Sequence, residues 1–312
     1  MIEVQNLSKR FDTFQAVDDI SFSVNKGEVL GFLGPNGAGK STTMKMITGF
    51  LSISGGSVSV CGADVKKSPI DVKKSIGYLP EGAPAYGDMT VKSFLSFIAD
   101  VRGFHGSEKE KRINNAIEKA NLESVTYKTI DTLSKGFKRR VGLAQAILHD
   151  PPVLIMDEPT DGLDPNQKHE VRLLIKEMSK DKAIIISTHI LEEVDAICDR
   201  AMIIANGKVK FDGTPKELEN MSVNHNSVLL TLDGYPSLNV EKLLGEVEGV
   251  DRVELANSES EKVTYRIFPE DNALIESAVG HLVQQEGWVV DAMSVEKGRL
   301  EDVFRQLTVG DQ

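Results

Sequence analysis

The sequence predicts an α/β fold built on a buried parallel sheet. A glycine-rich loop at 34–42 lies between a short apolar run and a segment with helical spacing. Two later runs, 153–156 and 183–186, are too apolar for half-exposed strands and fit strands buried in a parallel sheet. The stretch from about 84 to 150 is mostly helical in pattern, so it forms an insertion between strands.

The central motif is the glycine-rich loop itself. Its glycines allow the tight turn that brings successive backbone N–H groups to face one anion, and the following helix adds its positive dipole end. Lys40 can reach the β- and γ-phosphates of a nucleotide, and the Ser41 hydroxyl can ligate Mg²⁺. A chance Gly-rich turn is disfavoured by the flanking strand and helix, so this P-loop predicts a bound nucleoside triphosphate. The motif consists of Gly34, Pro35, Asn36, Gly37, Ala38, Gly39, Lys40, Ser41 and Thr42.

The segments around the loop predict strands and an antiparallel β subdomain. Alternating residues at 2–4 and 20–24 indicate two strands before the loop, and 57–60 and 75–79 indicate two after it. Phe11 lies between the first two strands. It is as consistent with a core position as with a functional one.

Three helices are predicted in the insertion. Ser107 and Glu110 have the spacing of a capping box at the start of the second helix. The third begins near Leu133 and runs through Ile147. An apolar stripe on the first helix is formed by Phe94, Phe97, Ile98 and Val101.

Three ionisable residues, Asp157, Glu158 and His189, come directly after the buried strands. Ligands of open α/β sheets bind at the carboxyl ends of the strands. Asp157 suits holding Mg²⁺ through water or Ser41, Glu158 suits polarising an attacking water, and His189 can donate to the γ-phosphate or the water. The alternatives are that the carboxylates cap the next turn and that the histidine is structural. Their shared edge with the P-loop favours catalysis.

A second anion site is predicted where the third helix of the insertion begins. Ser134 and Gly136 stand at that helix N-terminus, although Ser134 also suits an ordinary N-cap. The insertion lies away from the first phosphate site. Two half-sites for one triphosphate in one chain predict two chains that face each other head to tail.

The later segments predict a helix at 166–179 and, after residue 213, a second domain. Asn206 and Gly207 form a strong hairpin signal between strands 201–204 and 208–211. The order beyond 213 is strand, helix, strand, strand, helix, strand, which is that of a ferredoxin-like α+β unit. Its segments are 228–232, 236–244, 250–255, 263–268, 272–285 and 288–295, with a closing helix at 300–307.

The distribution of charged residues along the chain indicates a domain boundary and the kinds of partner that the protein can bind. Residues 213–312 contain 19 acidic and 8 basic side chains, which accounts for the whole net charge of −11. The expected domains are therefore 1–215 and an acidic accessory domain, 216–312. This accessory domain either packs against the first or biases its dimerisation through a twin or a membrane subunit. No basic surface is evident, so nucleic acid is not an expected partner.

Composition excludes further classes. The 312 residues are 27% charged and 40% hydrophobic, as in soluble globular proteins. Apolar runs stay far below the roughly 20 residues of a membrane span, and the N-terminus has no secretory signal pattern. Cys61 and Cys198 have no metal or redox spacing and indicate a reducing compartment.

Over residues 1 to about 215, the chain resembles the ATP-binding subunit of an ABC transporter. The matching motifs are Walker A at 34–42, a signature loop at 133–140, Walker B at 153–158, a D-loop at 161–164 and the switch histidine His189. Phe11 fits the aromatic that stacks on adenine in this family. The signature, the run 78–81 and the ending 300–304 resemble the exporter branch that includes drug-efflux and gliding-motility transporters.

Two residues depart from the family pattern. Lys135 replaces the first glycine of the signature, but its backbone N–H remains. Glu81 stands where the family usually has the Q-loop glutamine, and as a carboxylate it could ligate Mg²⁺ or contact the water. Because Glu158 and His189 are present, a competent ATPase is expected.

The resemblance implies a homodimer that sandwiches two ATP molecules with Mg²⁺. Each ATP would be held by one chain's P-loop and by Ser134, Lys135 and Gly136 of the other, with Asp164 in the D-loop close by. The implied protein is cytoplasmic, on the inner face of the cell membrane, and powers export through a separate permease. A soluble ABC-type ATPase that acts on ribosomes or DNA is the main alternative, and a non-hydrolysing regulatory module is a third.

Overall fold

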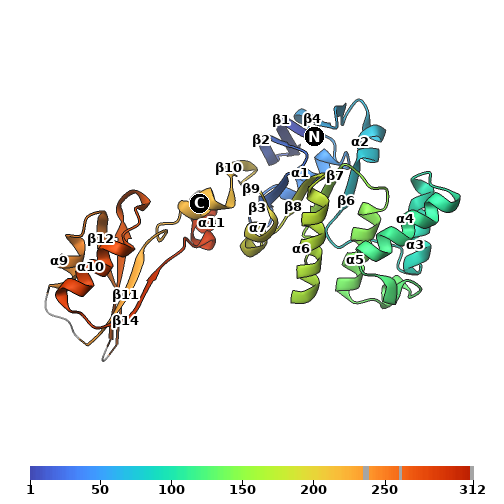
Figure 1. Cartoon of the computed structure of the whole chain (residues 1–312). Helices are drawn as coiled ribbons and strands as arrows, with labels where there is room; N and C mark the ends of the chain where they lie inside the picture. The colour runs from blue at the N-terminus through green and yellow to red at the C-terminus, as the bar shows by residue number, and fades with distance from the viewer. Residues whose placement is uncertain (235–238, 260–261, 310–312) are drawn as a thin grey trace. The chain divides into compact units, whose positions relative to one another are not determined.

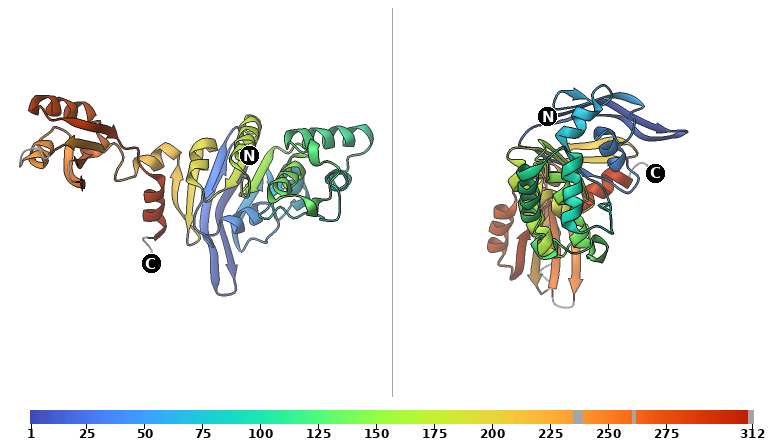
Figure 2. Two further views of the ribbon diagram at one scale, coloured as in Figure 1. Left: turned by 90° about the horizontal axis from the view of Figure 1, so that it is seen from below. Right: turned by 90° about the vertical axis from the view of Figure 1, so that its right-hand side faces the viewer.

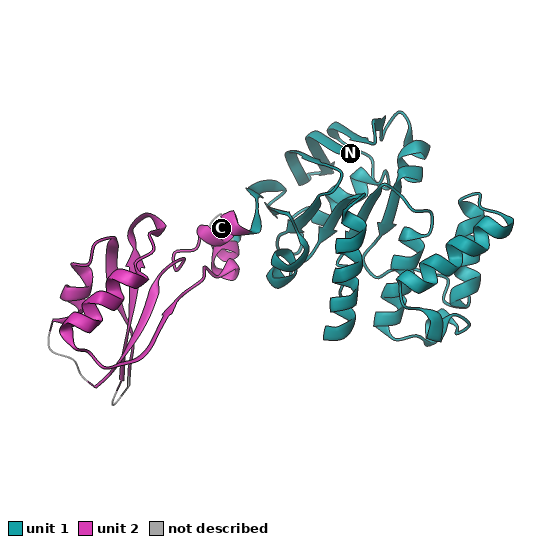
Figure 3. Ribbon diagram, viewed as in Figure 1, with its two compact units in different colours: residues 1–215, 307–312 teal, residues 216–306 magenta. Residues whose placement is uncertain are grey.

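The chain divides into two compact units in a computed structural model that describes residues 1–234, 239–259 and 262–309 (Figures 1 and 3). Unit 1 consists of residues 1–215 and 307–312, and unit 2 of residues 216–306. Each unit has its own hydrophobic core. Among the described residues, we find no helix with the length and apolar character needed to cross a bilayer.

A six-stranded sheet forms the centre of unit 1, in the order β10-β9-β3-β8-β7-β6. All neighbouring pairs are parallel except β9 and β10. Every residue of β3, β7 and β8 is buried, which confirms the strands predicted from continuous apolar runs. The strands are β3 (Val29–Leu33), β6 (Ile76–Leu79), β7 (Val153–Asp157), β8 (Ala183–Ser187), β9 (Arg200–Ala205) and β10 (Lys208–Gly213).

An antiparallel sheet in the order β2-β1-β4-β5 lies beside the parallel one, as predicted. The two sheets share a core, in which the rings of Phe22 and Phe32 meet edge to face at 5.4 Å. Helix α1 contributes Met44 and Met46 to the same core. The elements are β1 (Ile2–Phe11), β2 (Phe14–Val24), β4 (Gly55–Val60), β5 (Ala63–Asp64), α1 (Lys40–Ile47) and α2 (Pro69–Ser75).

The helical insertion consists of α3 (Val91–Val101), α4 (Gly106–Lys119) and α5 (Lys135–Ile147) around a core of its own (Figure 2). Two details of its prediction were wrong. Helix α4 begins at Gly106, so Ser107 lies inside the helix and no side chain caps it. On α3, Phe94 is buried, but Val101 is 68% exposed. The buried face is instead made of Val91, Phe94, Leu95 and Ala99.

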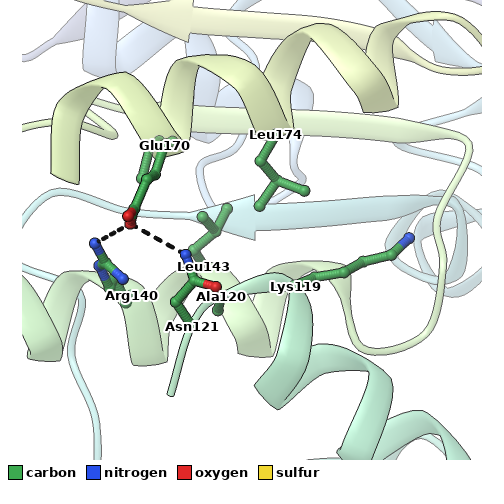
Figure 4. Close-up of a pocket in the computed structure, with 8 residues that line it drawn as sticks. Lys119, Ala120, Asn121, Arg140, Leu143, Glu170 and Leu174 are labelled. Carbon is green, nitrogen blue, oxygen red and sulfur yellow. Dashed lines mark hydrogen bonds and ion pairs between the residues drawn. The ribbon is translucent and has the colours of Figure 1, made fainter. Parts of the chain in front are cut away.

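Helix α6 (Pro165–Ser179) is joined to the insertion by side-chain hydrogen bonds. In Figure 4, the Glu170 carboxylate receives hydrogen bonds from Arg140 of α5, at 2.7 Å, and from the Asn121 side chain, at 3.1 Å. The Arg140 side chain is only 7% exposed. An ion pair between a buried guanidinium and a half-exposed carboxylate therefore joins α5 to α6.

The hairpin of β9 and β10 was predicted from the sequence, whereas the two short helices on either side of it were not. The β9–β10 hairpin turns at Asn206 and Gly207, which have φ angles of +51° and +75°. Positive φ at both turn residues is typical of a type I′ hairpin. Helix α7 spans Leu191–Ile197, and α8 spans Pro215–Asn220 at the boundary of the units.

Unit 2 has the predicted ferredoxin-like order, with an antiparallel sheet arranged β12-β13-β11-β14. One face packs Leu230 and Ile267 into the core of the unit. The other face is polar, with a Thr231–Thr264 hydrogen bond and an Arg266–Glu296 ion pair. Part of the predicted helix 236–244 lies outside the described residues. The elements are β11 (Val228–Asp233), α9 (Val240–Gly245), β12 (Val250–Glu259), β13 (Lys262–Pro269), α10 (Glu276–Glu286) and β14 (Val290–Val295). Helix α11 (Leu300–Val309) follows, and its residues from 307 on are assigned to unit 1.

Candidate nucleotide-binding site

The P-loop fills the turn between β3 and α1, where two glycines have no room for a side chain. Gly34 has a φ of +153°, and a Cβ there would lie 2.1 Å from the Ile204 carbonyl oxygen. Gly39 is the N-cap of α1, and its Cβ would lie 2.6 Å from the Ala16 carbonyl oxygen. Because both contacts are with backbone, a larger residue would displace the loop. No side chain caps α1, so its first N–H groups can receive an anion.

Lys40 is folded back onto its own loop. Its ammonium group donates hydrogen bonds to the Gly34 carbonyl at 2.6 Å and to the Pro35 carbonyl at 3.0 Å. Burial lowers the pKa of Lys40, while the nearby carboxylates, with Glu158 the strongest, act in the opposite direction. The charge of Lys40 is therefore held in place beside the loop, where a phosphate can meet it.

A cavity of about 450 Å³ opens against the P-loop, which is within the usual range for small-molecule sites. Seven loop residues, 36–42, line it, while Gly34 and Pro35 do not. Opposite them lie three carboxylates. The remaining lining residues are Phe11, Phe14, Ala16, Glu81, Asp157 and Glu158.

Two aromatic rings border this cavity at the tip of the β1–β2 hairpin. Phe11 is 42% exposed and Phe14 is 61% exposed, so the core interpretation of Phe11 is excluded. They are cross-strand partners. The Lys9 ammonium lies 4.9 Å from the centre of the Phe11 ring, in a cation–π contact that holds one side of it. Exposed rings at the mouth of a polar cavity suit stacking on a nucleotide base.

Asp157 ends β7 inside the cavity and is 3% exposed. Ser187 of the neighbouring strand donates a short hydrogen bond to its Oδ1, and the buried Oδ2 has no hydrogen-bond partner. A free buried carboxylate oxygen and the Ser41 hydroxyl on the same cavity are the oxygen ligands that Mg²⁺ takes. No cluster of three His, Cys, Asp or Glu suited to a metal occurs in the described part of the chain. The residues therefore fit an ion that also uses phosphate and water oxygens.

Glu158 and His189 are brought together across the edge of the sheet. The His189 Nδ1 lies 2.9 Å from the Glu158 Oε1. Glu158 has a φ of +51°, and its N–H donates to the Ser187 carbonyl and hydroxyl oxygens, each at 3.1 Å. A non-glycine residue in this left-handed region is held there by its surroundings. Because the Glu158 carboxylate contacts His189, it does not serve as the cap of the next turn, which was the alternative interpretation.

Glu81 reaches the same cavity from the end of β6. Arg139 of α5 binds the backbone next to Glu81. The Arg139 guanidinium donates to the Pro80 carbonyl at 2.8 Å and to the Asp157 carbonyl. Burial lowers the pKa of Arg139, with the Asp157 carboxylate acting against that shift. Arg139, on the helix that begins in the signature loop, thus holds the backbone next to Glu81 and the backbone of Asp157.

Comparison with known proteins decides the family. The ABC transporter family model matches residues 17–161. An uncharacterised ABC transporter ATP-binding protein of Bacillus subtilis, YhcH, is 33% identical over 99% of this chain and 96% of its own. The linearmycin resistance ATP-binding protein LnrL of B. subtilis is 31% identical over 99% of this chain and 98% of its own. The chain belongs to the ABC transporter family.

A solved structure supports the fold. The ATP-binding cassette MJ0796, solved as a dimer bound to ADP and phosphate in a post-hydrolysis state, superimposes with a TM-score of 0.65. It is 21% identical and covers 69% of this chain and 99% of its own. ABC ATP-binding domains bind ATP and are ATPases, and this chain is an ATP-binding subunit of that family.

The ABC signature loop lies apart from the cavity. Ser134 is the N-cap of α5 and accepts a hydrogen bond from the Phe137 N–H at 3.3 Å, in agreement with the interpretation of Ser134 as an ordinary N-cap. Lys135 packs against Gly162 of the D-loop, and Gly136 lies against Gln167. Asp164 caps α6 by accepting from the Gln167 N–H at 2.9 Å. None of the four predicted residues 134–136 and 164 borders the ATP cavity of its own chain.

The sequence patterns missed three residues at this ABC site: Phe14, Arg139 and Ser187. Phe14 could have been found from its spacing, because a tight turn after Phe11 pairs the two rings across the hairpin. Ser187 could also have been predicted, because it ends an apolar strand two residues before His189. Arg139 gave no signal, because its partners lie 18 and 59 residues away in the chain.

Proposed function

We propose that this chain hydrolyses ATP as half of a head-to-tail homodimer and thereby drives export through a separate membrane permease. The observation that carries the proposal is the Glu158–His189 contact at 2.9 Å, because Glu158 lines the cavity that also holds Lys40 and the P-loop. A carboxylate held by a histidine opposite a phosphate-binding lysine suits activation of water against a γ-phosphate.

The residues around the cavity take separate roles in this proposal. Phe11 stacks on adenine, and the N–H groups of 36–42 hold the phosphates together with Lys40. Glu158 accepts the proton of the attacking water, and His189 orients Glu158 and donates to the γ-phosphate. Ser41, Asp157 and Glu81 would hold Mg²⁺, which neutralises charge on the phosphate oxygens when it is bound.

The homodimer follows from the residues that the cavity lacks. Ser134, Lys135, Gly136 and Asp164 lie together at the starts of α5 and α6, outside their own chain's cavity. The P-loop cavity of one chain and the α5 N-terminus of another would be the two halves of one ATP-binding site. A two-fold arrangement of two chains supplies both halves twice. The dimeric state described for the MJ0796 cassette supports this assembly.

The permease site that we propose is an apolar groove of about 500 Å³, lined by residues of α2, β6, α3 and α5 and by the segment that follows α1. Phe50 is 73% exposed, Ile70 62% and Val101 68%, and Lys73, Lys74 and Arg102 stand around them. Exposed apolar side chains gathered in one groove indicate a protein contact. An amphipathic segment of the permease would cover them, with the chain bound to the inner face of the membrane. The names of the relatives, which include multidrug and linearmycin resistance proteins, support export.

Affinity purification of the tagged chain from detergent-solubilised membranes tests this function. We expect a multi-spanning membrane protein to co-purify with an ATPase-active chain. Val101→Glu should release it without loss of basal ATPase activity, while Leu173→Glu on exposed α6 should not release it. Co-sedimentation with ribosomes or DNA in place of membranes would instead support the soluble ABC-type ATPase.

A further inference from the structure

A buried carboxylate lies directly beneath the catalytic edge and has no part in the roles above. Glu193 of α7 is 1% exposed, whereas its neighbour Glu192 is on the solvent side of the same short helix. Burying a carboxylate requires hydrogen bonds and opposite charges to offset the loss of hydration. The identity of those partners therefore indicates what the charge does.

Both oxygens of Glu193 accept hydrogen bonds from threonines on the two catalytic loops. Thr160 donates to Oε1 at 2.5 Å, and Thr188 donates to Oε2 at 2.9 Å. Thr160 follows Glu158 by two residues, and Thr188 directly precedes His189. Both threonines are at most 2% exposed. One carboxylate thus joins the loop after β7 to the loop after β8, just behind the residues that meet at the cavity.

Two cations connect the same carboxylate to α6. Lys168 and Arg172, one helical turn apart, each place a nitrogen 3.7 Å from the Glu193 Oε1. These charges offset the burial of the carboxylate. Helix α6 begins immediately after Asp164, so Glu193 joins three elements: the Glu158 loop, the His189 loop and the helix that follows the D-loop.

Stability alone does not account for a charged residue here. A buried ion pair can commonly be replaced by apolar residues of similar volume without loss of stability. What an apolar residue could not do is hold two hydroxyl groups at once. The Glu158–His189 contact depends on two irregular loops, and Glu158 itself has a left-handed backbone conformation. A group that binds both loops, as Glu193 does, keeps the distance between them fixed.

We propose that Glu193 is a positioning residue, which sets the distance between Glu158 and His189 through Thr160 and Thr188. The inference rests on the proposed ATPase function and adds a residue to it. It places no group of Glu193 in contact with the nucleotide. Loss of the tie should therefore slow hydrolysis and leave ATP binding intact.

Glu193→Gln tests this role with Glu192→Gln as the matched control, in the full-length chain. Glu193→Gln should lower kcat about 10- to 100-fold, as expected when a catalytic group is misplaced, and change the KM for ATP less than about threefold. Glu192→Gln should leave both constants unchanged. A wild-type rate for Glu193→Gln in an active protein overturns the positioning role alone, whereas a wild-type chain that binds ATP without hydrolysing it overturns the proposed function.

A double-mutant cycle separates positioning from a general structural role. In a His189→Ala background, adding Glu193→Gln should change kcat less than about twofold, because the contact that it positions is already gone. A further fall equal to that of the single variant would overturn the proposal. If Glu193→Gln does not fold, Thr160→Val should show the same loss of kcat and Thr160→Ser should restore most of it. Equal rates for Val and Ser would overturn the proposal.

Discussion

Helices α1 and α5 both have a glycine close to their N-terminus, but the two N-termini differ in what they contact. The α1 terminus has a glycine cap, has no side-chain cap and lies in a cavity with three carboxylates and two exposed rings. The α5 terminus is capped by Ser134 of its own chain and borders no such cavity. In the proposed dimer, the α1 terminus of one chain binds the nucleotide and the α5 terminus of the other chain covers it. On that proposal, a single chain contains both halves of a site without joining them.

The largest effect should come from the α1 side. Glu158→Gln keeps the shape of the side chain but removes the carboxylate that we propose accepts the proton of water. We expect kcat to fall on the order of 10³-fold, with ATP affinity within a few-fold of wild type. Phosphate release and equilibrium binding of ATP measure the two effects. Glu177→Gln, on the exposed face of α6, is the control. Turnover near the wild-type rate would remove Glu158 from the catalytic role.

A mixing experiment tests whether the α5 side completes a partner's site. Lys40→Ala and Ser134→Arg should each reduce ATPase activity more than about 100-fold when alone. Random pairing of equal amounts makes half of the dimers mixed, and each mixed dimer has one intact site of two. The mixture should therefore recover about a quarter of the wild-type rate. Two folded variants that recover nothing on mixing would contradict sharing between chains.

The aromatic rings on the α1 side should contribute a moderate share of affinity. Phe11→Ala should weaken binding of a non-hydrolysable ATP analogue about 5- to 30-fold, since stacking of a base on an aromatic ring is worth roughly 1–2 kcal/mol. Phe14→Ala should have a smaller effect in the same direction. Calorimetry with Phe50→Ala as an exposed control measures both. Unchanged affinity for Phe11→Ala would show that the base binds elsewhere.

The smallest effect is expected at Glu81, which the α1 cavity has in place of an amide. Glu81→Gln removes one negative charge beside Asp157 and Glu158 but keeps an oxygen ligand. The Mg²⁺ concentration for half-maximal ATPase activity should rise about two- to fivefold, with little change in the maximal rate. A titration of Mg²⁺ at constant ATP measures this. An identical Mg²⁺ dependence would exclude Glu81 from the metal site.

The difference between the two N-termini also explains how much could be predicted from the sequence. The P-loop, Asp157, Glu158 and His189 were evident because each directly follows a buried strand, and the ends of parallel strands meet at one edge. Ser134 was equally evident as a helix start. Arg139 and Glu193 were not, because their partners come from loops that only the fold brings near. The shift of the buried face on α3 had a similar cause: several apolar stripes were possible, and packing against α4 and α5 selected one.

The ion pair between Arg140 and Glu170 has a mechanical consequence. Separating these side chains would leave the buried guanidinium of Arg140 without a carboxylate partner, which costs free energy although Glu170 is half exposed to water. Rotation of the insertion as a rigid body together with α6 avoids that cost. Helix α6 also carries Lys168 and Arg172, which hold Glu193. Motion of the insertion would thus be transmitted through α6 to Glu193 and, in our proposal, to the loops that hold Glu158 and His189.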